Sequence, residues 1–221
     1  MSYLPDIKTR DLLGKKEIII YPYFDNFQGP NCYYCHIGPN FLVPKATKKE
    51  FDPLIKNEKD DFFKKELHRD QFILGPHAFV LAESFELFGV DELHAIRLFN
   101  SSSLARCGIG HMALGMINPG CGKDDPVRIT LELVNNSPFP VKLIPSTIVK
   151  DKVVFGTEVF KVSVLNMESK PQTDYADWKN SVFASDKGPV SSKMHLRYEK
   201  TREFQLKDNL CPKYGKGSSP K

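Results

Sequence analysis

Short apolar segments separated by turn residues make up most of the chain after residue 15. Several of them alternate apolar and polar positions with the period of two that is typical of a half-buried β-strand. Such a series of short strands favours an all-β sandwich or barrel. The pattern predicts strands over residues 15–21, 72–76, 78–86, 94–99, 110–117, 127–134, 141–144 and 152–165.

The rest of the pattern predicts little helix. Residues 6–13 form an amphipathic segment, with Pro5 suited to the first turn of a helix and Gly14 to its end. Residues 22–40 hold Pro, Gly and Asn among aromatic residues, which predicts loops. Residues 45–65 are dense in charge and poor in alternation, so we expect a solvated connection or a short helix there.

The length and net charge of the chain limit the classes of protein to which it can belong. A chain of 221 residues suits one substantial domain, which we place at residues 1–212, followed by a disordered tail over 213–221. The net charge of +4 fits an anionic ligand but is too small to indicate nucleic acid.

No apolar run approaches the ~20 residues of a membrane span, so we expect no membrane partner. The N-terminus lacks the pattern of a secretory signal. The chain is therefore predicted to be cytoplasmic, with its five cysteines as thiols rather than disulfides.

Three consecutive segments carry the candidate chemistry. Residues 100–108 hold three serines and Arg106, residues 115–120 form a Pro-Gly turn, and residues 129–135 form a strand with one carboxylate, Glu132. Alternation would turn the leucines on either side of Glu132 to the opposite face of the strand. An acid with apolar neighbours and a serine and an arginine nearby is a candidate proton-transfer site. A purely structural role for these residues is the open alternative, because serine-rich turns often cap helices and acids on strands often face solvent.

These segments, Ser-Ser-Leu-Ala-Arg106, Ile-Asn-Pro-Gly120 and Leu-Glu132, resemble those of the dCTP deaminases in the trimeric dUTPase-like superfamily. The resemblance implies a mainly β fold, a distorted jelly-roll or barrel with a few short helices. It also implies a homotrimer whose sites lie between subunits. The implied reaction is hydrolytic deamination of dCTP to dUTP and ammonia, with no metal at the ring and with Mg²⁺ on the nucleotide phosphates only.

The resemblance assigns roles to particular residues. Glu132 is the implied proton shuttle, Arg106 its electrostatic partner, and Ser102 the group that orients the water or the amino group. The implied substrate-binding residues are Ser101, Ser103, Leu114 through the backbone, Asn118, Tyr175 and Lys187.

The chain also departs from the family pattern. The Gly-Arg before the serines is Asn-Ser101 here, so a phosphate-contacting arginine is missing. Asn118 replaces an aspartate that activates water in dUTPases, which argues against dUTP hydrolysis because an amide is no base. Val182 and Asp186 stand where the family has lysine and glutamine. The candidate substitutes as point charges are Lys179, Lys187 and Lys193. A second hypothesis is therefore a dUTPase-fold protein that binds nucleotide or another protein without turnover, and dUTP hydrolysis is a third.

Other groups of residues in the sequence are candidate cofactor sites. Cys32, Cys35 and His36 match the Cys-x-x-Cys-His motif of a haem attachment site, but haem attachment requires export. A zinc ion bound by these three residues would need a fourth ligand. Neither the motif of the zinc deaminases nor a glycine-rich phosphate loop occurs in the sequence. For His111 a core or supporting role is the expectation.

Overall fold

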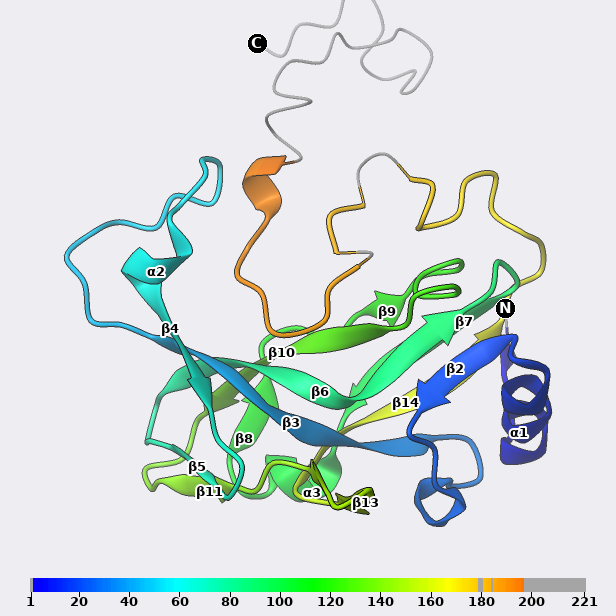
Figure 1. Ribbon diagram of the computed structural model, residues 1–221, viewed down its shortest axis with the longest axis horizontal. Helices are drawn as coiled ribbons and strands as arrows, with labels where there is room; N and C mark the ends of the chain where they lie inside the picture. The colour runs from blue at the N-terminus through cyan, green and yellow to red at the C-terminus, as the bar shows by residue number, and fades with distance from the viewer. Residues whose placement is uncertain (1, 179–180, 184, 197–221) are drawn as a thin grey trace, which may run out of the picture.

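The computed structural model describes residues 2–178, 181–183 and 185–196, which are mainly β (Figure 1). The helices are α1 (Asp6–Lys15), α2 (Lys59–Phe62) and α3 (Ser102–Ala105), and Asp25–Phe27 forms a 3₁₀ turn. The strands are β1 (Ser2–Tyr3), β2 (Ile18–Tyr21), β3 (Tyr33–Pro44), β4 (Phe63–Leu67), β5 (Phe72–Leu74), β6 (Phe79–Val90), β7 (His94–Asn100), β8 (Ile109–His111), β9 (Met116–Ile117), β10 (Val127–Asn135), β11 (Val141–Leu143), β12 (Thr147–Val149), β13 (Lys152–Val154) and β14 (Glu158–Asn166).

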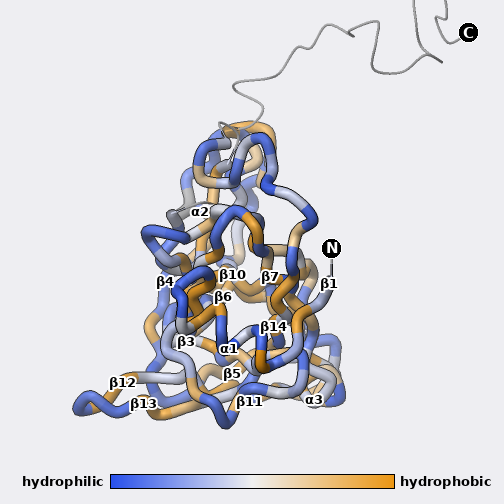
Figure 2. Tube along the Cα trace, turned by 90° about the vertical axis from the view of Figure 1, so that its right-hand side faces the viewer, coloured by the Kyte–Doolittle hydropathy of each residue, from blue (hydrophilic) through white to orange (hydrophobic). Residues whose placement is uncertain are grey.

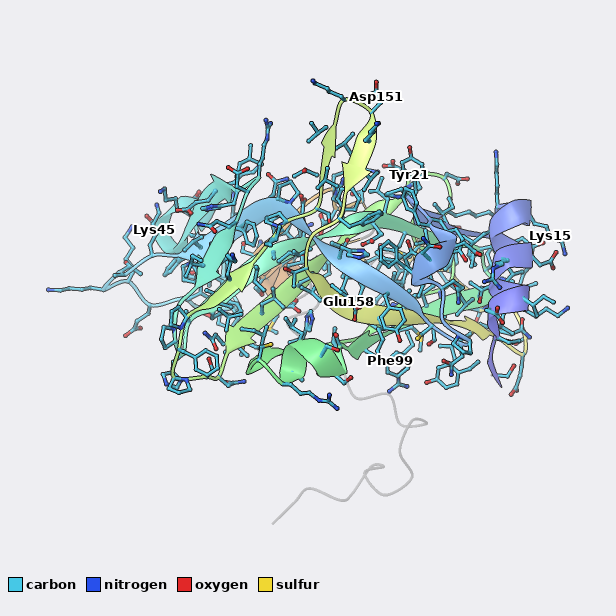
Figure 3. All side chains as sticks on the ribbon, turned by 90° about the horizontal axis from the view of Figure 1, so that it is seen from below. Lys15, Tyr21, Lys45, Phe99, Asp151 and Glu158 are labelled. Carbon is cyan, nitrogen blue, oxygen red and sulfur yellow. The ribbon has the colours of Figure 1, made fainter. Side chains whose placement is uncertain are left out.

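One curled antiparallel sheet organises the described part of the chain. Its main path runs β8-β10-β6-β3-β14-β7-β9, with β1 on β14, β2 on β6 and β4 on β3. Two smaller sheets pair β5 with β11 and β12 with β13. The β12–β13 hairpin, which carries Asp151 at its tip, projects from the body (Figure 3). The predicted mainly β fold with a few short helices is confirmed.

The core lies between the curled layers of this sheet. Figure 2 shows hydrophobic positions gathered where β6, β7 and β10 run and hydrophilic ones in the outer loops. Burying such side chains is the main driving force of folding, and their close packing fixes the strand positions. The largest fully buried side chains include Tyr33, Phe41, Phe88, Phe160, Leu131 and Leu133.

Strand β6 is buried over almost its whole length because β2, β3 and β10 all pair with it. It nevertheless carries two fully buried acids, Glu83 and Glu86. The Glu86 carboxylate contacts His36 Nδ1 at 2.8 Å and accepts a hydrogen bond from the His36 amide at 2.9 Å. A buried acid needs such partners, since an unpaired buried charge is strongly destabilising.

The loop prediction over residues 22–40 is wrong for its second half, which forms most of β3. This strand pairs with β4, β6 and β14, and non-local pairing overrides the turn composition. Cys35 and His36 are thereby buried in the sheet.

Two predicted strands are divided in the structure. Residues 110–117 were expected as one strand, but β8 pairs with β10 whereas β9 pairs with β7, so the two pieces belong to different parts of the sheet. The segment 152–165 is split into β13 and β14 around Gly156. A side chain at Gly156 would collide with the Ile144 carbonyl.

Helix α1 runs two residues past the predicted end. Gly14 lies inside it, and the left-handed residue that ends it is Lys16, with φ 59°. The amides of Lys16 and Glu17 bond to the carbonyls of Leu13 and Leu12, which satisfies the last turn.

No helix in the described part of the chain is long and apolar enough to cross a membrane. The cysteines at 32, 35, 107 and 121 are free thiols. Lys179, Cys211 and the predicted tail at 213–221 lie outside the described residues.

Leu131 tests the core assignment, because its side chain is fully buried on the inner face of β10. Leu131→Ala should lower the free energy of unfolding by about 2–5 kcal/mol, the usual cost of a large-to-small change in a core. The matched control is Leu67→Ala on β4, where the side chain is 55% exposed and the loss should be small. Urea denaturation of the two variants measures this, and equal losses would contradict the assignment.

Candidate active site

A pocket of about 640 Å³ opens beside β10 and has the size of a small-molecule site. Its floor comes from β10 and from the segment 115–121 that contains β9 and the Pro-Gly turn. Aromatic side chains from the connection before α2, from β4 and from β6 form one wall, and described residues between 175 and 192 form another. The aromatic and aliphatic wall consists of Phe51, Phe63, Phe79 and Leu81.

Glu132 reaches this pocket by the alternation of β10. Leu131 and Leu133 are fully buried in the core, so the side chain between them faces the pocket. The Glu132 carboxyl is half-buried, and desolvation raises its pKa above the ordinary value. A carboxyl with a raised pKa exchanges protons more readily near neutral pH, which suits a group that must both take and give a proton.

Two of the predicted binding residues lie in the same pocket as Glu132. Asn118 and Tyr175 both line it, although 57 residues separate them in the sequence. The Tyr175 amide donates to the Pro119 carbonyl at 2.8 Å, which fixes the tyrosine segment on the Pro-Gly turn. Asn118 and Tyr175 also border an adjoining pocket of about 220 Å³ together with Trp178, whose ring centroid is 6.1 Å from that of Tyr175.

The C-terminal wall of the pocket is attached to the free edge of β10. The Arg128 amide donates to the Asp186 carbonyl at 3.0 Å, and the Val190 amide donates to Thr130 Oγ1 at 3.2 Å. Figure 1 shows this segment, in orange, descending onto β10. This C-terminal segment thus closes the pocket through hydrogen bonds within the chain.

Lys187 is predicted to bind substrate, but the structure places it outside the pocket lining. Its Nζ pairs with the Asp125 carboxylate and donates to the Pro126 carbonyl at 2.6 Å. Both partners belong to the inserted turn that precedes β10. The role of Lys187 toward a phosphate stays a prediction.

Ser101 has a structural position in this chain. It caps α3 by accepting a weak bond from the Leu104 amide at 3.5 Å, and its hydroxyl donates to Glu158 Oε1 at 2.8 Å. Its side chain is buried, and Figure 3 shows Glu158 beside α3. The capping alternative raised by the sequence therefore applies to Ser101, and a contact with substrate stays a prediction.

Ser102, Ser103 and Arg106 are exposed on or next to α3, and none of them lines the pocket. Figure 1 places α3 on the opposite side of the sheet from the segment that closes the pocket. Leu114 is partly buried against the core, next to Gly115 of the pocket floor. A single chain therefore joins Glu132 with Asn118 and Tyr175, but not with Ser102 or Arg106.

His111, expected to have a supporting role, packs beneath β10. Its Nε2 contacts the Val159 carbonyl at 3.0 Å, and burial lowers the pKa of the imidazole. The ring is therefore neutral near pH 7, when it can donate to that carbonyl.

Sequence reasoning missed Arg128, which lines the pocket four residues before Glu132 on the same strand. The same period of two that selected Glu132 could have found it. Asp186 was noted only as a departure from the family, but it also lines the pocket. Its Oδ1 pairs with Lys193 at 2.6 Å, and Oδ2 has no hydrogen-bond partner among the described residues.

Residues of the types that bind metal ions cluster outside the pocket in the described part of the chain. Glu17, Asp91 and His94 bring ligand atoms within 4.8 Å of one another, and none of the three lines the pocket. His94 Nδ1 already contacts Asp91 at 2.8 Å. Cys35 and His36 lie in the sheet, where His36 Nδ1 contacts the Glu86 carboxylate.

The fold and the pocket define a curled antiparallel β protein with a desolvated acid in a small-molecule site. The chain belongs to the dCTP deaminase-like family, whose model (DCD: dCTP deaminase-like) matches residues 3–155.

Known relatives agree with this assignment. The chain is 30% identical over 207 residues to a "dCTP deaminase, dUMP-forming" of Nanoarchaeum equitans, covering 86% of this chain and 96% of that one. It is 29% identical over 181 residues to the protein of the same name from Pseudarthrobacter chlorophenolicus, covering 81% of this chain and 78% of that one. The fold is similar to the solved 2'-deoxycytidine 5'-triphosphate deaminase of Agrobacterium tumefaciens, with a TM-score of 0.52 and 14% identity. That match covers 73% of this chain and 47% of the solved one.

The raised pKa of Glu132 makes stability depend on pH in a defined direction. Well below the ordinary value of 4.5 the carboxyl is protonated in both folded and unfolded chains. As the pH rises, the unfolded chain ionises first, so the free energy of unfolding of the wild type falls until the pH passes the raised pKa. Glu132→Gln cannot ionise. The melting temperature of this variant should therefore rise relative to that of the wild type as the pH increases from about 4 through the raised pKa.

Thermal melts across this pH range measure the effect. Glu50→Gln, in the exposed connection before α2, is the matched control and should show no such gain. A constant difference between Glu132→Gln and wild type at all pH values would contradict the desolvation of Glu132.

Proposed function

We propose that this protein catalyses the hydrolytic deamination of a deoxycytidine nucleotide, most simply dCTP to dUTP and ammonia. The observation that carries the proposal is the desolvated Glu132 carboxyl in a pocket of small-molecule size. Family membership supports it, since the relatives named above are dCTP deaminases. The proposed setting is the cytoplasm, as the sequence predicts.

In the proposed reaction Glu132 both takes and gives a proton. Its carboxylate takes a proton from water as the water oxygen bonds to ring carbon C4. The same carboxyl then gives that proton to the amino group, the bond from C4 to the amino nitrogen breaks, and ammonia leaves. The second water proton moves from the C4 hydroxyl to N3, which leaves the C4 carbonyl of uracil. One group can do both because desolvation brings its pKa closer to the working pH. The proposal needs no metal at the ring, and Mg²⁺ enters bound to the phosphates of the nucleotide.

We place Ser102 and Arg106 in the site from a neighbouring chain of a homotrimer. Both residues are exposed and distant from the pocket of their own chain, as expected for groups that act across an interface. Arg106 would offset charge on the ring or hold the carboxylate, and Ser102, with Ser103 beside it, would orient the water by a hydrogen bond.

The product is proposed to be dUTP. Asn118 lines the pocket and can hydrogen-bond a sugar hydroxyl, but its amide cannot activate a second water at the phosphates. The relatives named above carry "dUMP-forming" in their names, which describes those proteins. The identity of the product therefore separates this chain from those relatives.

Glu132→Gln is the direct test of the reaction. The wild type should release ammonia from dCTP and form dUTP, whereas the variant should lose turnover by about two orders of magnitude or more, because an amide cannot carry the proton. The variant should still be stabilised by dCTP in a thermal melt, since the pocket is intact. Ammonia assays and separation of dUTP from dUMP are the measurements. Full activity in the variant would contradict the role of Glu132, and dUMP with pyrophosphate would contradict the product.

A mixture of two inactive variants tests the shared site. Glu132→Gln and Arg106→Ala chains, denatured together and refolded at equal concentration, should recover about a quarter of the wild-type activity, because one in four interfaces pairs an intact Glu132 with an intact Arg106. Each variant refolded alone is the control. No recovery in mixed oligomers would show that both residues must come from one chain.

Nucleotide binding without turnover is the second candidate, and Asp186 favours it. Its carboxylate adds a second negative charge to the pocket, where the resemblance calls for a neutral glutamine. Stabilisation of the wild type by dCTP or dUTP, with no ammonia from either dCTP or dCMP, would support this candidate over the enzyme.

A further inference from the structure

Arg128 is the only lysine or arginine among the described residues that line the pocket. It is the second residue of the strand that carries Glu132, and both residues line the pocket. At ~3.3 Å per residue, four residues separate them by about 13 Å, less the effect of the β-bulge between Arg128 and Thr130. The pocket therefore has an acid toward one end of β10 and a cation toward the other.

The guanidinium of Arg128 is held in place by β6. Nη1 donates to the Ser84 carbonyl at 2.8 Å and to the Phe85 carbonyl, and Nε lies 4.0 Å from a Glu83 carboxylate oxygen. An arginine has five N–H donors in a rigid fork, and these contacts use Nη1 and Nε. Among the described residues Nη2 has no hydrogen-bond partner, so its donors can serve a ligand in the pocket. The side chain is 25% exposed, so it is partly desolvated but still accessible.

Two lysines of the described C-terminal segment beside the pocket are paired with acids of the chain. Lys187 pairs with Asp125, and Lys193 pairs with Asp186. At two positions where the family resemblance calls for a basic residue, this chain has Ser101 and Val182. An anionic ligand in this pocket would therefore find its positive partner at Arg128.

We propose that Arg128 binds the phosphate end of the substrate, and that this contact makes the protein select a nucleotide over a nucleoside. The inference rests on the proposed function and names the residue that recognises the anionic part of that substrate. An arginine suits this task because its guanidinium keeps its charge, and Nη2 can donate to phosphate oxygens while β6 holds Nη1. The fixed guanidinium loses little freedom on binding, since the carbonyls of β6 already orient it.

A purely structural role is the competing explanation. Glu83 is 1% exposed, and its Oε2 has no hydrogen-bond partner among the described residues. Arg128 could serve only to balance this buried charge. Removal of Glu83's charge distinguishes the two explanations, because a balancing role disappears with that charge and an anion-binding role does not.

The experiment compares Arg128→Gln, Glu83→Gln and the double variant with the wild type. Thermal shifts are measured with dCTP, deoxycytidine and sodium tripolyphosphate, and kcat and KM are measured for dCTP. Arg128→Gln should raise the KM for dCTP about tenfold or more with little change in kcat, as expected for a contact made equally in ground and transition states. It should also abolish stabilisation by tripolyphosphate and leave any stabilisation by deoxycytidine unchanged.

The double variant decides between the two explanations. It also controls for misfolding of Arg128→Gln, because the double variant carries no unbalanced charge at position 83. A double variant that binds dCTP and tripolyphosphate as the wild type does would overturn the inference. The inference would be supported if the double variant still fails to bind dCTP and tripolyphosphate while Glu83→Gln alone binds both like the wild type. Stabilisation of the wild type by tripolyphosphate that depends on Arg128, without deamination, would uphold the inference and refute the proposed function. Deamination with binding independent of Arg128 would do the reverse.

Discussion

The alternation of β10 is the constraint on which the rest of the structure depends. Leu131 and Leu133 are fully buried and fix the strand in the core, and this leaves Glu132 no orientation except toward the pocket. A shift of one residue would bury the carboxylate in the core and expose two leucines, which the hydrophobic effect opposes strongly. The same packing that stabilises the sheet therefore fixes the acid in a desolvated position and raises its pKa.

Local patterns in the sequence account for much of the fold and for part of the site. Strand periodicity located β6, β7 and β10, and it placed Glu132 opposite its leucine neighbours as the structure shows. It failed for β3, where Pro, Gly and aromatic residues indicate a loop, because three partner strands decide the conformation. The split between β8 and β9 was equally hidden, since pairing partners distant in sequence determine it.

The missing parts of the site have the same physical origin. Nothing near Asp186 in the sequence indicates that its carbonyl bonds to the amide of Arg128, 58 positions earlier. Ser101 and Arg106 look like one motif with Glu132 when the sequence is read in order. In the fold, however, α3 and the closing segment lie on opposite sides of the sheet (Figure 1). Resemblance supplied the residue types, but only the three-dimensional arrangement shows which of them a single chain brings together.

The ends of the sheet carry a consequence for how chains can associate. Along its main path the last strand is β8 at one end, with three residues, and β9 at the other, with two. Edges this short offer few unpaired amides and carbonyls, which is a common protection against edge-to-edge aggregation. Strand addition at these two ends is therefore a poor route to an oligomer, which favours association through side-chain surfaces there.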